Sequence, residues 1–137
     1  MSNVAAAILI NEDLKVLLQL RDNKSFLRSA GLWSLPGGHI EELESPEDAV
    51  RREVFEETNI SNWSPKFLMT LNDVFEPGPS VTVHIFTDQI FPPYSIILAE
   101  GQKLKFFDKK ELVNLKMNQY LDLVINYAYL ALNNKYL

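Results

Sequence analysis

The segment that covers residues 38–60 constrains this chain more than any other part of its sequence. It reads GHIEELESPEDAVRREVFEETNI. Ser45 is a good helix N-cap, Pro46 fits the first helical position, and Asp48 stands where the acid of a capping box belongs. The segment therefore predicts a helix that begins at about Pro46 and ends at about Thr58.

Three glutamates of the predicted helix fall on one side of it. At about 100° per residue, Glu53, Glu56 and Glu57 lie within an arc of about 100°. Like charges one turn apart destabilise a bare helix by a few tenths of a kcal/mol, so we expect a compensating partner. Mg²⁺ and Mn²⁺ prefer oxygen ligands of this kind. The arrangement indicates a divalent-metal site, and an acidic helix that merely faces solvent is the alternative.

The whole segment resembles the Nudix box, the signature of hydrolases that cut a diphosphate linked to another group. The pattern is Gly38, five residues, Glu44, seven residues, and then Arg52-Glu53-Val54-Phe55-Glu56-Glu57-Thr58-Asn59-Ile60. Eight of its nine defined positions match, and the exception is Asn59, where the family usually has glycine. Asparagine is the usual substitute for glycine in the left-handed conformation that ends a helix, so we expect the carboxylate geometry to be kept.

The resemblance has implications for the fold and for the cofactor. It implies an α/β fold, the Nudix α/β/α sandwich, with a mixed β-sheet between helices, and we expect residues 1–137 to form one domain. It also implies Mg²⁺ or Mn²⁺ as the cofactor. The implied metal ligands are the Gly37 carbonyl, Glu53, Glu56, Glu57 and Glu100. The implied structural residues of the box are Gly38, Glu44 and Asn59.

Two glutamates compete for the role of general base. Glu100 lies in a Glu-Gly-Gln sequence that resembles a loop of MutT-type members of the family, where the glutamate reaches the metal cluster from outside the helix. The resemblance makes Glu100 a metal ligand or the base, Glu53 is the other contender, and the sequence leaves the choice open. Arg52 completes the candidate catalytic group, because its guanidinium can neutralise the cluster and orient Glu44 or Glu56 through paired hydrogen bonds.

Three further residues are candidate substrate contacts. Arg21 ends a predicted strand, and its guanidinium matches phosphate geometry, although a surface arginine would look the same. Gly38, next to Gly37, lets the backbone approach a ligand closely. Asn118 lies near where MutT-type enzymes place an asparagine against the base, and a helix N-cap is the alternative.

The rest of the chain predicts the other elements of such a fold. Apolar runs predict strands over residues 4–10, 14–20, 66–75, 81–91 and 103–107. The strand over 81–91 alternates like one with a single buried face. A last helix is predicted over 117–133, and it is apolar on nearly every side. Because such a helix is buried on more than one side, it suggests a homodimer contact.

Composition narrows the class of protein. The 137 residues are 47% hydrophobic and 23% charged, which is ordinary for a globular domain. Without cysteine, the chain has neither disulfides nor zinc–thiolate sites. The net charge of −5 argues against binding to long nucleic acid. The N-terminal apolar run is short and lacks a basic start, so we expect a strand of a cytoplasmic enzyme with no membrane partner.

The predicted function is metal-assisted hydrolysis of a small nucleotide. The Glu-Gly-Gln loop and Asn118 favour a nucleoside triphosphate, with oxidised purine nucleotides among the candidates, which would give the monophosphate and pyrophosphate. The alternative is a diphosphatase for ADP-ribose or a nucleotide sugar. A third interpretation is a module that senses a nucleotide without cutting it, although such a module would be expected to lose a carboxylate from the box.

Overall fold

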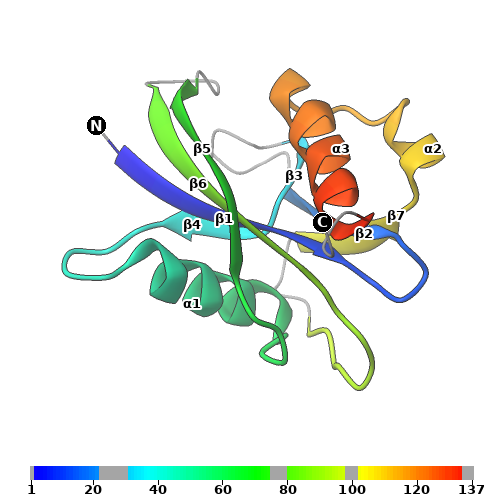
Figure 1. Cartoon of the computed structure of the whole chain (residues 1–137), viewed down its shortest axis with the longest axis horizontal. Coiled ribbons are helices and arrows are strands. Elements are labelled where there is room, and N and C mark those ends of the chain that lie inside the picture. The colour runs from blue at the N-terminus through cyan, green and yellow to red at the C-terminus, as the bar shows by residue number, and fades with distance from the viewer. Residues whose placement is uncertain (1, 22–30, 75–79, 98–101, 134–137) are drawn as a thin grey trace.

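The described part of the chain folds around a seven-stranded β-sheet with helices on both faces (Figure 1). The computed structural model describes residues 2–21, 31–74, 80–97 and 102–133. In chain order the elements are β1 (Ser2–Ile10), β2 (Val16–Arg21), β3 (Trp33–Ser34), β4 (Gly37–His39), α1 (Pro46–Thr58), β5 (Lys66–Val74), β6 (Val81–Gln89), β7 (Gln102–Phe107), α2 (Lys109–Leu112) and α3 (Gln119–Asn133). The predicted sandwich, with its sheet between helices, is confirmed.

The sheet is mixed because β1 has neighbours that run in both directions. The strand order is β3-β2-β1-β6-β5, while β4 also pairs with β1 and β7 pairs with β2. β1 runs parallel to β6 along its whole length and antiparallel to β2 and β4. The short strand β4, which leads into α1, is therefore fixed against the central strand of the sheet.

Side chains of β1 alternate between two hydrophobic cores. Ile8 and Ile10 belong to the core under α3, whereas Ala7 and Leu9 belong to the core under α1. Figure 1 shows these two helices on opposite sides of the sheet. A strand that is buried on both faces has no need of polar alternation, which explains the continuous apolar sequence of β1.

β6 is also buried on its second face at Thr82 and Phe86, although His84 between them is only partly buried, so the expectation of a single buried face was wrong at these two positions. Phe86 is 4% exposed and Thr82 is 9% exposed. The Phe86 ring packs in the core under α1, which covers the face that the sequence pattern left to solvent. Hydrogen bonds to β1 on one side and β5 on the other complete the burial of its backbone.

Of the predicted boundaries that shift, two do so for identifiable local reasons. β2 begins at Val16, because Leu14 lies in a turn with a φ of 61°. α3 begins at Gln119 and not at 117, because Met117 forms a β-bridge with Trp33. Both shifts concern the residues just before an element, β2 or α3, and neither changes the fold.

α3 buries one face and exposes an apolar strip on the other. Its buried side chains are Leu121, Val124, Ile125, Ala128 and Tyr129. Leu123, Tyr127 and Leu130 are 73%, 54% and 58% exposed. The single chain therefore buries α3 on one side only, which corrects the expectation of burial on more than one side. Among the described helices, none has the length and apolar character needed to cross a membrane.

Candidate active site

Helix α1 begins and ends where its cap residues predict. The Ser45 hydroxyl accepts a hydrogen bond from the Asp48 backbone N–H at 3.1 Å, and Pro46 occupies the first turn. Asn59 ends the helix with a φ of 69°, and its N–H donates to the Phe55 carbonyl at 2.8 Å. The predicted helix bounds and the left-handed conformation predicted for Asn59 are confirmed, and they fix which way the glutamates of α1 face.

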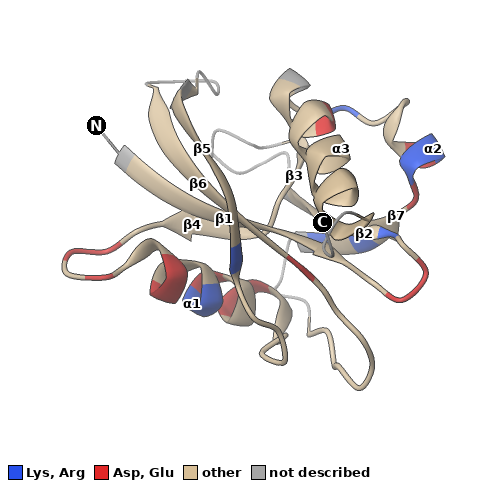
Figure 2. Ribbon diagram, in the orientation of Figure 1, with Lys and Arg blue, Asp and Glu red and all other residues tan. Residues whose placement is uncertain are grey.

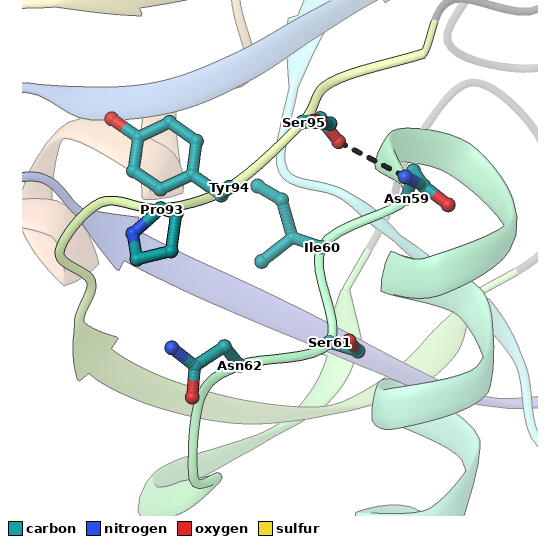
Figure 3. Close-up of a pocket in the computed structure, with 7 residues that line it drawn as sticks. All are labelled: Asn59, Ile60, Ser61, Asn62, Pro93, Tyr94 and Ser95. Carbon is teal, nitrogen blue, oxygen red and sulfur yellow. Dashed lines mark hydrogen bonds between the residues drawn. The ribbon is translucent and has the colours of Figure 1, made fainter.

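The Asn59 side chain makes a contact that glycine could not make. Its Nδ2 donates to the Ser95 carbonyl at 3.2 Å and ties the end of α1 to the segment after β6 (Figure 3). Beside this bond, residues 59–62 and 93–95 line an open hollow of about 250 Å³. Glu53, Glu56 and Glu57 do not line it, so the hollow is separate from the acidic face of the helix.

Two glycines let β4 lie close to both β1 and α1. In the β1–β4 pair, Gly38 stands opposite Ala5 and Gly37 opposite Ala6. A Cβ at Gly37 would lie 2.3 Å from the Ala5 carbonyl oxygen. A Cβ at Gly38 would lie 2.4 Å from the carboxylate carbon of Glu53. Both distances are too short for any side chain, so the glycines allow the Glu53 carboxylate to lie directly against β4.

The Glu57 carboxylate is held at the same pair of glycines. The Gly37 N–H donates to Glu57 Oε2 at 3.1 Å and lies 3.4 Å from Oε1. From β2, the amide Nε2 of Gln19 lies 3.4 Å from Glu57 Oε1 and donates to the Leu35 carbonyl at 3.2 Å. Gln19 was not among the predicted site residues, and its only signal in the sequence was that one polar residue interrupts the apolar run of β2. The structure thus brings Glu57 and Glu53 together at β4.

Arg52 connects the remaining acidic side chains. Its Nε and Nη2 donate to the two carboxylate oxygens of Glu44 at 2.8 and 2.9 Å, which is the paired geometry that the sequence predicted. Its Nη1 donates to Glu53 Oε1 at 2.9 Å and lies 3.5 Å from Glu56 Oε2. Its Nη2 also donates to the His39 carbonyl at 3.1 Å. One guanidinium therefore joins the loop before α1 to the acidic face of the helix.

This network keeps Glu44 ionised. The hydrogen bonds from Arg52, followed by the one from the Glu41 backbone N–H at 3.0 Å, lower the pKa of Glu44 from 4.5 to about 2. The same carboxylate, with a smaller contribution from Glu53, raises the pKa of Arg52. Both groups are therefore charged throughout the physiological range, and Arg52 offsets part of the negative charge that Figure 2 shows along α1 and the loop before it.

The donor chemistry of the site fits a hard divalent cation. Glu53 and Glu57 offer carboxylate oxygens at β4, and the Gly37 carbonyl belongs to the same segment. The Glu56 side chain is 56% exposed and lies against Arg52. Among the described residues, no three acidic or histidine side chains converge closely enough to hold a metal ion by themselves. Mg²⁺ usually binds one or two carboxylates together with water and substrate phosphates, so this arrangement is compatible with it.

The other candidate residues lie apart from α1 in sequence. Glu100 lies outside the described residues, and so does the side chain of Arg21, whose backbone ends β2. Asn118 directly precedes α3 and is partly buried. Next to it, Met117 forms a β-bridge with Trp33, which belongs to the segment that leads into β4. The position of Asn118 fits a helix N-cap and leaves the predicted base contact untested.

A family model and a known enzyme each match more than half of this chain. The family model described as NUDIX domain matches residues 1–125, which include β4 and all of α1. The 8-oxo-dGTP diphosphatase of Proteus vulgaris is 32% identical over 84 residues, a region that makes up 61% of this chain and 72% of that protein.

Solved structures share the fold over almost the whole chain. The MutT protein from Methanosarcina mazei superimposes with a TM-score of 0.77 at 22% identity, and the match covers 99% of this chain and 96% of that one. The NUDIX domain of Shewanella oneidensis NrtR, solved with ADP ribose, gives a TM-score of 0.78 at 26% identity. That match covers 95% of this chain and 87% of the NrtR chain.

Proposed function

The chain belongs to the NUDIX domain family and is a Nudix hydrolase, and from this premise we propose that it hydrolyses a nucleoside triphosphate. Water attacks the triphosphate, and the products are the nucleoside monophosphate and pyrophosphate. The similarity to an 8-oxo-dGTP diphosphatase, at 32% identity, supports this choice. Oxidised purine nucleotides are therefore the first triphosphates to test.

One observation carries the proposal: two glutamates of α1 converge on the two glycines of β4. Glu53 and Glu57 lie there, and Glu56 stands one turn away from Glu53 on the same helix. Together with the Gly37 carbonyl, and with Glu100, which precedes β7 in the sequence, they are the proposed ligands of Mg²⁺ or Mn²⁺. A bound divalent cation would neutralise negative charge on the diphosphate oxygens.

The remaining residues are assigned to positioning and to proton transfer. Arg52 donates to Glu53 Oε1 at 2.9 Å and so holds this carboxylate in position. Glu53 or Glu100 takes the proton of the attacking water as general base. Arg21 is assigned to a substrate phosphate, and Asn118 to the base.

A second candidate substrate is a nucleoside diphosphate linked to a sugar, such as ADP-ribose or another nucleotide sugar. The NrtR NUDIX domain, which is 26% identical to this chain, was solved with ADP ribose. Hydrolysis of ADP-ribose would release AMP and ribose phosphate, whereas hydrolysis of a triphosphate releases pyrophosphate. The products therefore separate the two candidates, and tight binding without products would instead favour a nucleotide-sensing module.

We also propose that residues 1–137 act as one domain that pairs with a second copy through α3. The exposed strip of Leu123, Tyr127 and Leu130 follows helical spacing, so it forms one continuous apolar surface along α3. Surfaces of this kind in small domains are commonly covered by a partner.

The experiment that tests the catalytic proposal is Glu56→Gln. The substitution keeps the size of the side chain and removes one negative charge from the proposed metal site. We expect turnover of the preferred triphosphate in Mg²⁺ to fall on the order of 100-fold, the cost of removing one electrostatic stabiliser of a transition state. Glu47→Gln on the exposed first turn of α1 is the matched control and should keep native turnover. Equal turnover in both variants would contradict the role of the glutamate face.

A further inference from the structure

Gln19 is a polar side chain buried in an apolar strand. It is 1% exposed, and Val16, Leu17 and Leu18 before it on β2 are fully buried. Burial of an amide in such surroundings costs free energy unless the amide is hydrogen-bonded. The partners of Gln19 therefore indicate what this position contributes.

The Gln19 amide nitrogen faces two acceptors. Nε2 donates to the Leu35 carbonyl at 3.2 Å and to Glu57 Oε1 at 3.4 Å, the second being at the long end of the hydrogen-bond range. An amide nitrogen has two protons, so both contacts can be made at once. Because both partners are acceptors, the nitrogen and not the oxygen of the amide must point toward them. The orientation of the side chain is thus determined by its surroundings.

These contacts link Glu57 to the segment before α1. The Gly37 N–H donates to the Glu57 carboxylate from β4, and Gln19 reaches the same carboxylate from β2. Gln19 also holds the Leu35 carbonyl, two residues before Gly37. The Gln19 amide therefore holds the Glu57 carboxylate and the segment that leads into β4 in fixed positions relative to each other.

We infer that Gln19 is a positioning residue that orients the Glu57 carboxylate for divalent-cation binding. The inference rests on the proposed function, in which Glu57 is a metal ligand. A donor to a ligating carboxylate restricts its rotation, and loss of such a partner typically lowers metal affinity by about 10-fold to 100-fold. Since the Gln19–Glu57 distance is 3.4 Å, we expect an effect at the lower end of that range.

The first experiment compares Mn²⁺ binding by the native protein, Gln19→Met and Leu17→Met, measured by electron paramagnetic resonance of free Mn²⁺. Methionine keeps the length of glutamine and removes both donors. Leu17 lies two positions away on the same face of β2 and is also fully buried, so its variant controls for altered packing. We expect Gln19→Met to bind Mn²⁺ about 10-fold more weakly, and Leu17→Met to bind like the native protein.

The second experiment asks whether Gln19 acts through Glu57. In a Glu57→Gln background, Gln19→Met should cause no further loss of Mn²⁺ affinity, because the carboxylate that it orients is gone. An equal loss in both backgrounds would mean that Gln19 supports the fold and not the carboxylate. Unchanged Mn²⁺ affinity in Gln19→Met alone would also overturn the inference.

Two controls accompany these experiments: the folding of the Gln19→Met variant, and Mn²⁺ binding and hydrolysis by the native protein. If circular dichroism shows that Gln19→Met does not fold, Gln19→Leu replaces it in the same comparison. Failure of the native protein to bind Mn²⁺ or to hydrolyse any nucleotide would overturn the proposed function together with this inference. Native Mn²⁺ binding and hydrolysis, with Gln19→Met unaffected, would overturn the role of Gln19 alone.

Discussion

Replacing Gly38 by alanine changes the space available to the Glu53 carboxylate and little else. The added Cβ would lie 2.4 Å from the carboxylate carbon, whereas ordinary contact begins at 3.4 Å. The carboxylate must therefore move by about 1 Å, and a misplacement of about 1 Å at a catalytic group can cost about 100-fold in rate. We expect Gly38→Ala to lose about 100-fold in turnover, near 2.7 kcal/mol of activation free energy.

The same substitution should leave the fold almost intact. The group that must move is the end of a flexible side chain, and its ion pair with Arg52 involves side chains that are 18% and 25% exposed. Loss of such a partly solvated pair costs about 1 kcal/mol or less, or a fall of about 4 °C in melting temperature. Gly37→Ala is the contrasting variant, because its Cβ would meet the Ala5 carbonyl oxygen at 2.3 Å and disrupt the β1–β4 pair.

The assay combines thermal unfolding with Mg²⁺-dependent turnover of the preferred nucleotide. Gly38→Ala should melt close to the native protein and have little activity, while Gly37→Ala should lose stability. Native turnover by a folded Gly38→Ala protein would refute the reasoning, because it would mean that the position of the Glu53 carboxylate does not matter.

Three further predictions concern the edges of the site and α3. The pKa of Glu44 is 4.5 without its partners and about 2 beside Arg52. Because the unfolded chain binds this proton more tightly than the folded protein, the stabilisation by the Glu44–Arg52 pair is lost as the pH falls from 4.5 to about 2. Arg52→Met should therefore show a shallower fall in melting temperature between these pH values, and parallel curves would contradict this. Asn59→Gly loses the bond to Ser95 but relaxes a left-handed residue, so the free energy of unfolding should change by less than about 1 kcal/mol in urea titrations. For α3, light scattering should give twice the 15.7 kDa chain mass for the native protein and a single-chain mass for Leu123→Lys, and a native monomer at micromolar concentration would rule out the dimer.

Local signals in the sequence predicted the helix that carries the site. Ser45 and Asn59 act within one turn of their own positions, so the start and end of α1 could be predicted without knowledge of the tertiary structure. The link between Arg52 and Glu44 could also be predicted, since both side chains belong to one contiguous motif. Charge and spacing within a short segment were sufficient for these features.

Features that depend on distant contacts could not be predicted in the same way. β3 and β4 contain two and three residues, too few for a periodic pattern, and they exist because β2 and β1 supply their partners. The second buried face of β6 results from packing under α1, which the alternation of its sequence does not record. Gln19 could not be predicted for the same reason, because it contacts Glu57, which lies 38 positions away in the sequence.

The most direct test of the central claim is Mg²⁺-dependent hydrolysis by the native protein across a nucleotide panel, with the products identified by mass. The panel contains ordinary and oxidised nucleoside triphosphates, ADP-ribose and nucleotide sugars, each with and without a chelator. Our account predicts that a triphosphate is cut to its monophosphate and pyrophosphate, and that the chelator abolishes the reaction. Turnover that persists in the chelator, or release of inorganic phosphate in place of pyrophosphate, would contradict it.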